Sequence, residues 1–123
     1  MSERNFRQLL EKQWEQGKFL CVGLDSDFEK IPEAARGKGV RDTIVGFNRA
    51  IIDATKDIVC AYKPNSAFYE AHGDEGWSAL RETIQHIHEV APEIPVILDA
   101  KRADIGNTNK GYVRSAFDHL HAD

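Results

Sequence analysis

Three short apolar runs alternate along the chain with longer stretches of helical periodicity. Their continuous apolar character is typical of strands buried on both faces, and they span residues 19–24, 58–62 and 94–98. Amphipathic helices are expected over residues 40–54, 77–91 and 107–120. Buried strands joined by helices imply a parallel sheet with right-handed crossovers, so the sequence predicts an α/β fold.

The helical stretches carry apolar residues three and four positions apart, which is the spacing of one face of an α-helix. In the first stretch this face consists of Val40, Ile44, Phe47, Ile51 and Ala54. Another helix is expected over residues 2–16, ended by Gly17, and a loop over residues 26–39. The predicted order is therefore one helix followed by three strand–helix units.

Each predicted strand is followed at once by charged residues. Asp25 closes the first strand, Lys63 closes the second, and Asp99 with Lys101 closes the third. Because the carboxyl ends of parallel strands lie on one side of a sheet, we expect these side chains to converge. This convergence predicts a charged functional site at the strand ends.

The run Asp99-Ala-Lys-Arg-Ala-Asp104 is the densest part of this array. Asp99 and Lys101 are two residues apart and share a face while the strand persists. Asp104 can approach Lys101 from the other side, and a lysine between two carboxylates stays protonated. This arrangement suits delivery of a proton to carbon or stabilisation of a carbanion. A solvated salt bridge is the structural alternative.

Composition limits the class of protein. The chain has 123 residues, a formal net charge of −4 and 41% hydrophobic residues, which predicts one globular domain over residues 1–123. The acidic balance argues against nucleic acid as a partner, and no apolar run approaches the length of a membrane span. Cys21 and Cys60 are expected to be buried, reduced thiols of a cytoplasmic protein, in preference to a disulfide.

Other polar residues are less informative. His86 and His88, like His119 and His121, are two positions apart and diverge on a helix, so no metal site is predicted. Asn65 and Ser66 follow Lys63, and the sequence leaves open whether they contact the site or cap the next turn. The candidate residues therefore remain those at the strand ends.

Three segments carry a resemblance to one family. They are Val22-Gly-Leu-Asp25, Ala61-Tyr-Lys-Pro-Asn-Ser-Ala-Phe-Tyr-Glu70 and Leu98-Asp-Ala-Lys-Arg-Ala-Asp-Ile-Gly-Asn-Thr108. In order and position they resemble orotidine 5'-phosphate decarboxylase, and the Lys-Pro-Asn sequence is similar to its longer bacterial subgroup. The resemblance implies a (β/α)8 TIM barrel, of which this chain would be the N-terminal part: a helix plus three βα units.

The resemblance also implies an activity and roles for residues. Enzymes of this family convert orotidine 5'-monophosphate (OMP) to UMP and CO2 in pyrimidine biosynthesis, without a cofactor, as dimers. By this resemblance Asp25 binds the ribose hydroxyls, and Lys63 binds ribose and holds the charge network. Asp99 lies beside the departing carboxylate, and Lys101 donates the proton to C6. The residues expected to reach a neighbouring subunit's site are Asp104, Ile105 and Thr108.

Elementary chemistry is consistent with these residue types. Loss of CO2 from C6 leaves a vinyl carbanion with no adjacent π system to accept its charge. A fixed ammonium can stabilise that charge, and Lys101 can then quench it as a general acid. Destabilisation of the substrate carboxylate by Asp99 would contribute less.

The resemblance covers the whole chain but only three of the eight expected strands. The chain stops at Asp123, before a fourth strand, and in the family later loops supply the phosphate-binding arginine and a lid. Remote binding energy contributes to catalysis, so we expect the 123-residue chain to be weakly active or inactive alone. Its open sheet edges predict self-association or a longer natural protein.

Two alternatives stay open. One is a Mg²⁺-dependent sugar-phosphate decarboxylase or aldolase of the same barrel superfamily, which shares the D-x-K-x-x-D pattern. That class carries a metal-binding carboxylate at the second strand, where this chain has Lys63. The other is a non-enzymatic half-barrel. Sensitivity to EDTA and binding of a UMP analogue distinguish these alternatives.

Overall fold

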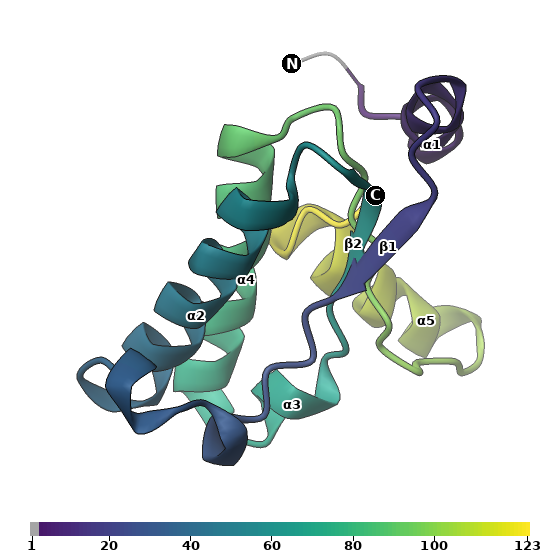
Figure 1. Ribbon diagram of the computed structural model, residues 1–123. Coiled ribbons are helices and arrows are strands. Elements are labelled where there is room, and N and C mark those ends of the chain that lie inside the picture. The colour runs from purple at the N-terminus through teal and green to yellow at the C-terminus, as the bar shows by residue number, and fades with distance from the viewer. Residues whose placement is uncertain (1–2) are drawn as a thin grey trace.

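Two parallel strands form the centre of the molecule (Figure 1). In the computed structural model, which describes residues 3–123, β1 (Leu20–Gly23) pairs with β2 (Val59–Lys63). α2 (Gly39–Thr55) connects the two strands, and α4 (Gly73–Val90) follows β2 and packs beside α2. The expected α/β class with parallel βα units is therefore confirmed.

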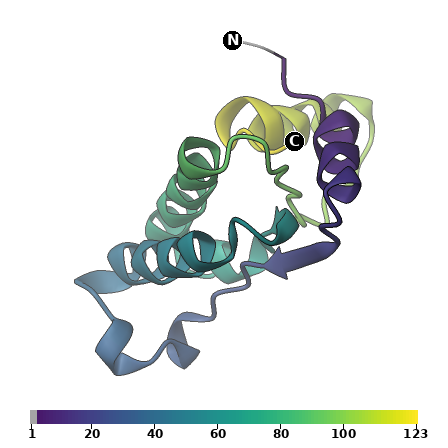
Figure 2. The same ribbon diagram turned by 45° about the horizontal axis from the view of Figure 1, so that its top comes forward.

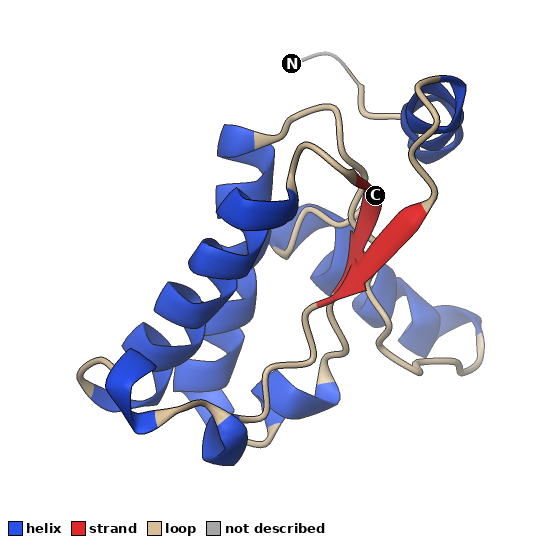
Figure 3. Ribbon diagram, in the orientation of Figure 1, coloured by secondary structure: helices blue, strands red, loops and turns tan. Residues whose placement is uncertain are grey.

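Shorter elements complete the chain. They are α1 (Phe6–Glu15), η1 (Phe28–Lys30), η2 (Glu33–Ala35), α3 (Ala67–Glu70), α5 (Gly106–Val113) and the π-helical segment η3 (Arg114–His119). In the view of Figure 3 the strands lie between the pair α2 and α4 and the helices α1 and α5. Figure 2 shows α2, α4, the α5–η3 segment and α1 following one another around the strands.

Local sequence signals explain where the first helix begins and ends. Asn5 lies at its N-terminus, and its side-chain oxygen accepts a hydrogen bond from the backbone N–H of Gln8 at 3.0 Å. Gly17 follows the helix with a φ of 76°, a left-handed conformation that glycine adopts without steric cost. The expected end of this helix at Gly17 is therefore confirmed.

The expected third strand is not continuous. Within the described residues, segment 94–99 lies beside β2 through two isolated parallel bridges, Tyr62 with Val96 and Asn65 with Asp99. The N–H of Ile97 donates to the carbonyl of Tyr62 at 2.9 Å, and that of Asp99 donates to the carbonyl of Pro64 at 3.0 Å. Proline has no N–H to return a bond at this position, which interrupts the ladder.

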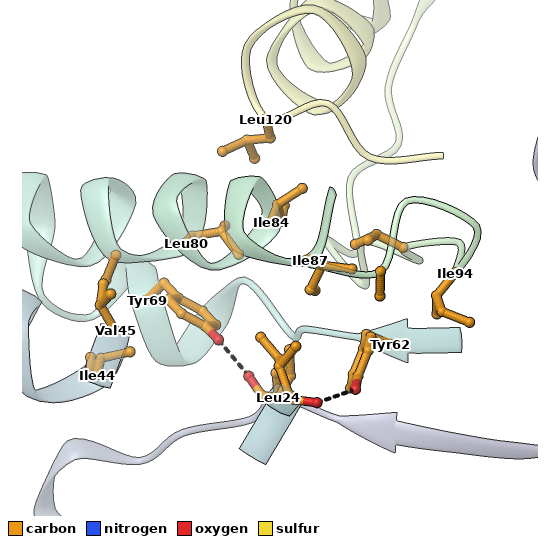
Figure 4. Packing of buried hydrophobic residues seen from close by; sticks show 14 of the residues in the cluster. Leu24, Ile44, Val45, Tyr62, Tyr69, Leu80, Ile84, Ile87, Ile94 and Leu120 are labelled. Carbon is orange, nitrogen blue, oxygen red and sulfur yellow. Dashed lines mark hydrogen bonds between the residues drawn. The ribbon is translucent and has the colours of Figure 1, made fainter. Parts of the chain in front are cut away.

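The core lies between the strands and the two long helices. Tyr62 of β2 and Ile52 of α2 are fully buried there, as are Leu80 and Ile84 of α4. Figure 4 shows these apolar residues facing one another, with Leu120 reaching the cluster from the C-terminal segment. The helical spacing in the sequence identified the buried face of α4, where Leu80 and Ile84 lie. For α2 it was only partly right: of the five residues named, Ile44 is buried, Ala54 is exposed and the other three are half-buried, whereas the fully buried Ile52 was not among them.

A different outcome is found for the last helical stretch. Its expected apolar face included Val113, Phe117 and Leu120, yet only Leu120 is buried, whereas Val113 and Phe117 are 52% and 50% exposed. The chain is helical as expected, but it changes from α5 to the wider π turn at Arg114, which breaks the 3.6-residue period. The apolar residues of this stretch therefore do not share one buried face.

A buried polar network joins the helices to the end of β1. The Asn48 side-chain N–H group donates to Tyr69 Oη and to Thr83 Oγ1, both at 2.9 Å, and Asn48 Oδ1 accepts from the Ser26 hydroxyl. The Tyr69 hydroxyl in turn donates to the carbonyl of Leu24 at 2.6 Å (Figure 4). Because every member has a partner, the network links α2, α3 and α4 to the residues beside Asp25.

The expectation for the two cysteines is half right. Cys60 in β2 is buried, but Cys21 in β1 is exposed, because its strand has a neighbour on one side only within the described residues. Both are free thiols. None of the helices within residues 3–123 is both long enough and apolar enough to cross a bilayer.

Candidate active site at the carboxyl ends of the strands

The segment after β2 ties three strand ends together. The N–H of Leu24 donates to the carbonyl of Lys63 at 3.2 Å. The N–H of Asn65 donates to Asp25 Oδ1 at 3.1 Å, and that of Ser66 donates to the carbonyl of Asp99 at 3.0 Å. The predicted convergence of Asp25, Lys63 and Asp99 on one side of the sheet is thus present in the structure.

Asp99 is the centre of the charge cluster. Lys101 Nζ lies 2.8 Å from both of its carboxylate oxygens, and Lys63 Nζ lies 3.7 Å from Oδ2. The hydrogen bond from Lys101 is the main cause that lowers the pKa of Asp99, and the charges of Lys101 and Lys63 lower it further. Asp99 is therefore an ionised carboxylate that holds two ammonium groups.

Lys101 reaches Asp99 by a turn, not along a strand. Its φ is 49°, a left-handed conformation that is uncommon for a residue other than glycine. The expectation that Asp99 and Lys101 share a face of a continuing strand is therefore wrong, although the two side chains do meet. Strained backbone of this kind is concentrated at functional sites, where surrounding contacts hold it in place.

Asp104 does not bracket Lys101 as expected. Its Oδ1 accepts from the N–H of Ile105 at 2.8 Å, and its own N–H donates to Asn109 Oδ1 at 2.8 Å. Within residues 3–123 the ion pairs of this cluster join Asp99 to Lys101 and Lys63. The geometry is one carboxylate between two ammonium groups, because the turn at Lys101 directs Asp104 toward the start of α5.

Ile105 and Thr108 begin α5 at the molecular surface. Ile105 is 70% exposed, and the Thr108 hydroxyl donates to the Ile105 carbonyl at 2.9 Å. Asp104 is exposed as well. These three residues face outward, so their expected contact with a neighbouring subunit stays a prediction.

The sequence left open whether Asn65 and Ser66 contact the site or cap the next turn, and the structure contains both kinds of contact. Asn65 Oδ1 accepts from the N–H of Ala67 at 3.1 Å, which is a local turn contact, while its backbone N–H bonds Asp25. Ser66 is 2% exposed and contacts the site through its backbone N–H. Their contribution comes from the backbone, a role that residue types alone do not reveal.

Sequence reasoning missed the residues that flank the cluster. Arg102, next to Lys101, forms an ion pair with Glu70 of α3 and lies over the ring of Tyr112, 5.7 Å from its centroid. The signal in the sequence was that Arg102 and Glu70 carry opposite charges and belong to two of the three family segments. They are 32 positions apart, and at that separation opposite charge does not indicate contact.

A cavity of about 660 Å³ lies between segment 97–102 and the last helical stretch. Asp99 and Lys101 contribute to its lining, together with apolar side chains such as Phe6 and Phe117. Asp25 and Lys63 do not line it. The cavity therefore reaches Asp99 and Lys101 of the charge cluster but does not extend to Asp25 and Lys63.

In the part of the chain that the structure describes, no group of three or more His, Cys, Asp or Glu side chains is arranged to hold a metal ion. The histidines are used otherwise: His86 Nε2 lies 2.8 Å from Asp53 Oδ1, and His88 Nε2 lies 2.8 Å from the His121 carbonyl. The charged groups at the strand ends are the Lys63 and Lys101 ammonium groups and the Asp25 and Asp99 carboxylates.

Comparison with known proteins connects this arrangement to a family. The sequence profile described as "Orotidine 5'-phosphate decarboxylase / HUMPS family" matches residues 18–123. The chain belongs to this family. The resemblance carried by the three segments at the strand ends is thereby confirmed.

Curated relatives of the family cover nearly the whole chain. The chain is 48% identical over 122 residues to orotidine 5'-phosphate decarboxylase of Christiangramia forsetii, covering 99% of this chain and 43% of the relative. The chain is 50% identical over 117 residues to orotidine 5'-phosphate decarboxylase of Flavobacterium johnsoniae, covering 95% of this chain and 42% of the relative. The chain thus spans about two fifths of the length of the curated relatives it matches.

Solved structures give the same family. OMP decarboxylase of Leishmania donovani superposes with a TM-score of 0.80 at 39% identity, covering 97% of this chain and 42% of that one. UMP synthase of the same organism superposes with a TM-score of 0.81 at 41% identity, covering 98% of this chain and 24% of that one. The fold is therefore a partial set of βα units of a TIM barrel, as the sequence predicted.

Proposed function

We propose that this chain carries the charge array of an orotidine 5'-phosphate decarboxylase, which converts OMP to UMP and CO2. The observation that carries the proposal is the Asp99 carboxylate held at 2.8 Å by Lys101 and at 3.7 Å by Lys63, at the carboxyl ends of parallel strands. The names of the relatives support this activity. We propose residues 1–123 as one domain, the N-terminal part of the barrel.

Each residue of the cluster has a role in this proposal. Asp25 and Lys63 bind the ribose, Asp99 lies beside the substrate carboxylate, and Lys101 faces C6. The C6–carboxylate bond breaks, CO2 departs, and the electron pair stays on C6 as a carbanion. The Lys101 ammonium stabilises that charge and transfers its proton to C6, which completes UMP. No cofactor takes part.

Charge explains why an ammonium is available for this step. The lowered pKa of Asp99 keeps the carboxylate ionised at neutral pH, and its negative charge holds the Lys101 ammonium at 2.8 Å. Lys101 is 72% exposed on its side chain, so a substrate can approach it. A fixed ammonium of this kind contributes about 10²–10⁴-fold to rate as a general acid.

The active assembly that we propose is a homodimer in the cytoplasm with OMP as its small-molecule substrate and no nucleic-acid partner. Asp104, Ile105 and Thr108 would complete the site of the second subunit. Their exposure at the start of α5 supports this role, because residues that serve another subunit's site must point away from their own.

Binding of UMP to the chain tests the assignment. Nuclear magnetic resonance with labelled lysine should show UMP shifting the signals of Lys63 and Lys101, and Lys63→Met should weaken binding. Lys56→Met is a matched control, because Lys56 also lies 3.7 Å from an aspartate, Asp57, away from the cluster. No shift at either lysine with millimolar UMP would contradict the assignment.

Turnover of OMP tests the chemistry separately. Lys101→Met should reduce whatever decarboxylation the chain shows by about 10²-fold or more, since it removes the proton donor. EDTA should leave the rate unchanged. Strict dependence on Mg²⁺ would instead favour a metal-dependent sugar-phosphate enzyme, and absence of UMP binding would favour a non-enzymatic half-barrel.

A further inference from the structure

The strained turn at Lys101 has few contacts of its own. Its φ of 49° is unfavourable for lysine. In the part of the chain that the structure describes, residues 100–103 make no backbone–backbone hydrogen bond. Such a conformation persists only where its surroundings hold it, so contacts of the residues on either side must do so here.

One short segment holds the chain on both sides of Lys101. The N–H of Ser66 donates to the Asp99 carbonyl at 3.0 Å, two residues before the lysine. Glu70, at the end of α3, forms an ion pair with the guanidinium of Arg102, the residue after it. Because both attachments come from residues 66–70, they set the distance that the turn must span.

A second contact links Arg102 to α5. Its guanidinium lies 5.7 Å from the centroid of the Tyr112 ring, within reach of a cation–π interaction. The Arg102 and Glu70 side chains are 41% and 25% exposed, so the pair is partly shielded from water. Arg102 therefore has a direction fixed by two partners from different elements.

We propose that Arg102, held by Glu70 and Tyr112, is a positioning residue that keeps Lys101 in its left-handed turn and its ammonium on Asp99. The catalytic consequence rests on the proposed function, because it assumes that Lys101 protonates the substrate. The structural part concerns only the geometry of this chain. Loss of either partner should let the turn relax and separate Lys101 from Asp99.

The titration of Asp99 distinguishes this role from simple electrostatics. The groups whose charges lower its pKa are Lys101 and Lys63. Glu70→Gln removes a negative charge, so electrostatics alone would lower the pKa of Asp99 further. Positioning predicts the opposite, a rise toward the ordinary value of 3.8, because Lys101 leaves the carboxylate. The sign of the change therefore decides between the two.

The experiment is carboxylate nuclear magnetic resonance of the 123-residue chain across the acid range. Glu70→Gln and Arg102→Met should both raise the pKa of Asp99 and shift the Lys101 Cα signal away from left-handed values, while Arg102→Lys should change them less. Glu82→Gln is the matched control, because Glu82 pairs with Arg41 between α4 and α2, away from the turn. An unchanged or lower pKa in Glu70→Gln would overturn the proposal.

Turnover separates this proposal from the proposed function. If the unaltered chain decarboxylates OMP, Glu70→Gln should lower kcat about tenfold with KM nearly unchanged, because it displaces the proton donor and leaves the ribose contacts. A raised KM with an unchanged kcat in Glu70→Gln would overturn the positioning role. If the unaltered chain is inactive, the Asp99 titration still tests the role of Arg102.

Discussion

At the scale of single residues, the site is defined by which carboxylate the lysines share. Asp99 receives Lys101 and Lys63, while Asp104 bonds the start of α5. A carboxylate shared by two ammonium groups resists protonation. The cluster thus stores a negative charge beside a proton donor, which suits a reaction that expels a carboxylate and protonates the carbon left behind.

Lys101→Met should make the free energy of unfolding change less between pH 7 and pH 2. The pKa of Asp99 is lowered in the folded chain, so its ionised form stabilises the fold above about pH 4 and this contribution is lost as pH falls through the folded value. We expect the variant to be less stable than the unaltered chain at pH 7, with a difference that narrows toward pH 2.

Urea unfolding followed by circular dichroism at both pH values measures this. Lys110→Met is the control, because Lys110 is an exposed lysine of α5 outside the cluster. The prediction fails if Lys101→Met lowers the free energy of unfolding by the same amount at pH 7 and at pH 2. Lys101 would then not stabilise the ionised form of Asp99.

At the scale of elements, the short helix α3 sets the position of the site. It lies against the N-terminal part of α4, where Gly76 leaves no room for a side chain: a Cβ built there would lie 1.6 Å from the carbonyl oxygen of Tyr69. The same segment, Ser66–Glu70, bonds Asp99 and Arg102. Close packing of α3 on α4 therefore fixes where segment 66–70 lies, and with it the position of Asp99 and Arg102.

Gly76→Ala should destabilise the chain by about 1–3 kcal/mol or more, because the added methyl group must push α3 away from α4. Gly46→Ala provides the opposite control in α2. A Cβ at Gly46 meets nothing within 4 Å, so alanine there should stabilise by about 0.5–1 kcal/mol through its helix propensity.

Thermal unfolding of the two variants gives both values. Gly76→Ala should also weaken UMP binding, because residues 65–66, directly before α3, carry the contacts to Asp25 and Asp99. Equal stability of the two variants would contradict the close approach of α3 and α4.

At the scale of the whole molecule, apolar surface is open at two places. Phe19 and Ile58, at the amino ends of the strands, are 72% and 56% exposed. Ile105 and Phe117, on the last helical stretch, are 70% and 50% exposed. Exposed apolar residues of this size are candidates for contact with other protein where they are contiguous, and β1 adds an unpaired strand edge within the described residues.

We expect the chain to self-associate, and two variants identify the surface. If the chain associates through the α5–η3 segment, Phe117→Glu should shift it toward monomer and Phe19→Glu should not. If strand edges pair, the effects reverse. Sedimentation velocity over a range of concentrations measures both. A monodisperse monomer at every concentration, melting cooperatively, would contradict the expectation.

Sequence alone determined the local features and the family. The spacing of apolar residues identified the buried face of α4 and part of that of α2, and the residue after each apolar run identified Asp25, Lys63 and Asp99 as one group. These succeeded because strand and helix periodicities, and the common direction of parallel strands, depend on neighbours in the chain. Three motifs in order then specified the family, which no composition could do.

Only the tertiary structure decided which groups meet. Pro64 interrupts the ladder of the segment beside it, Lys101 turns left-handed, and Arg102 finds Glu70 across 32 positions. Nearness in sequence predicts that Asp104 contacts Lys101, yet the turn directs Asp104 toward the start of α5. Contacts between distant residues depend on how packed elements place their backbones, and the local pattern of residues does not contain that information.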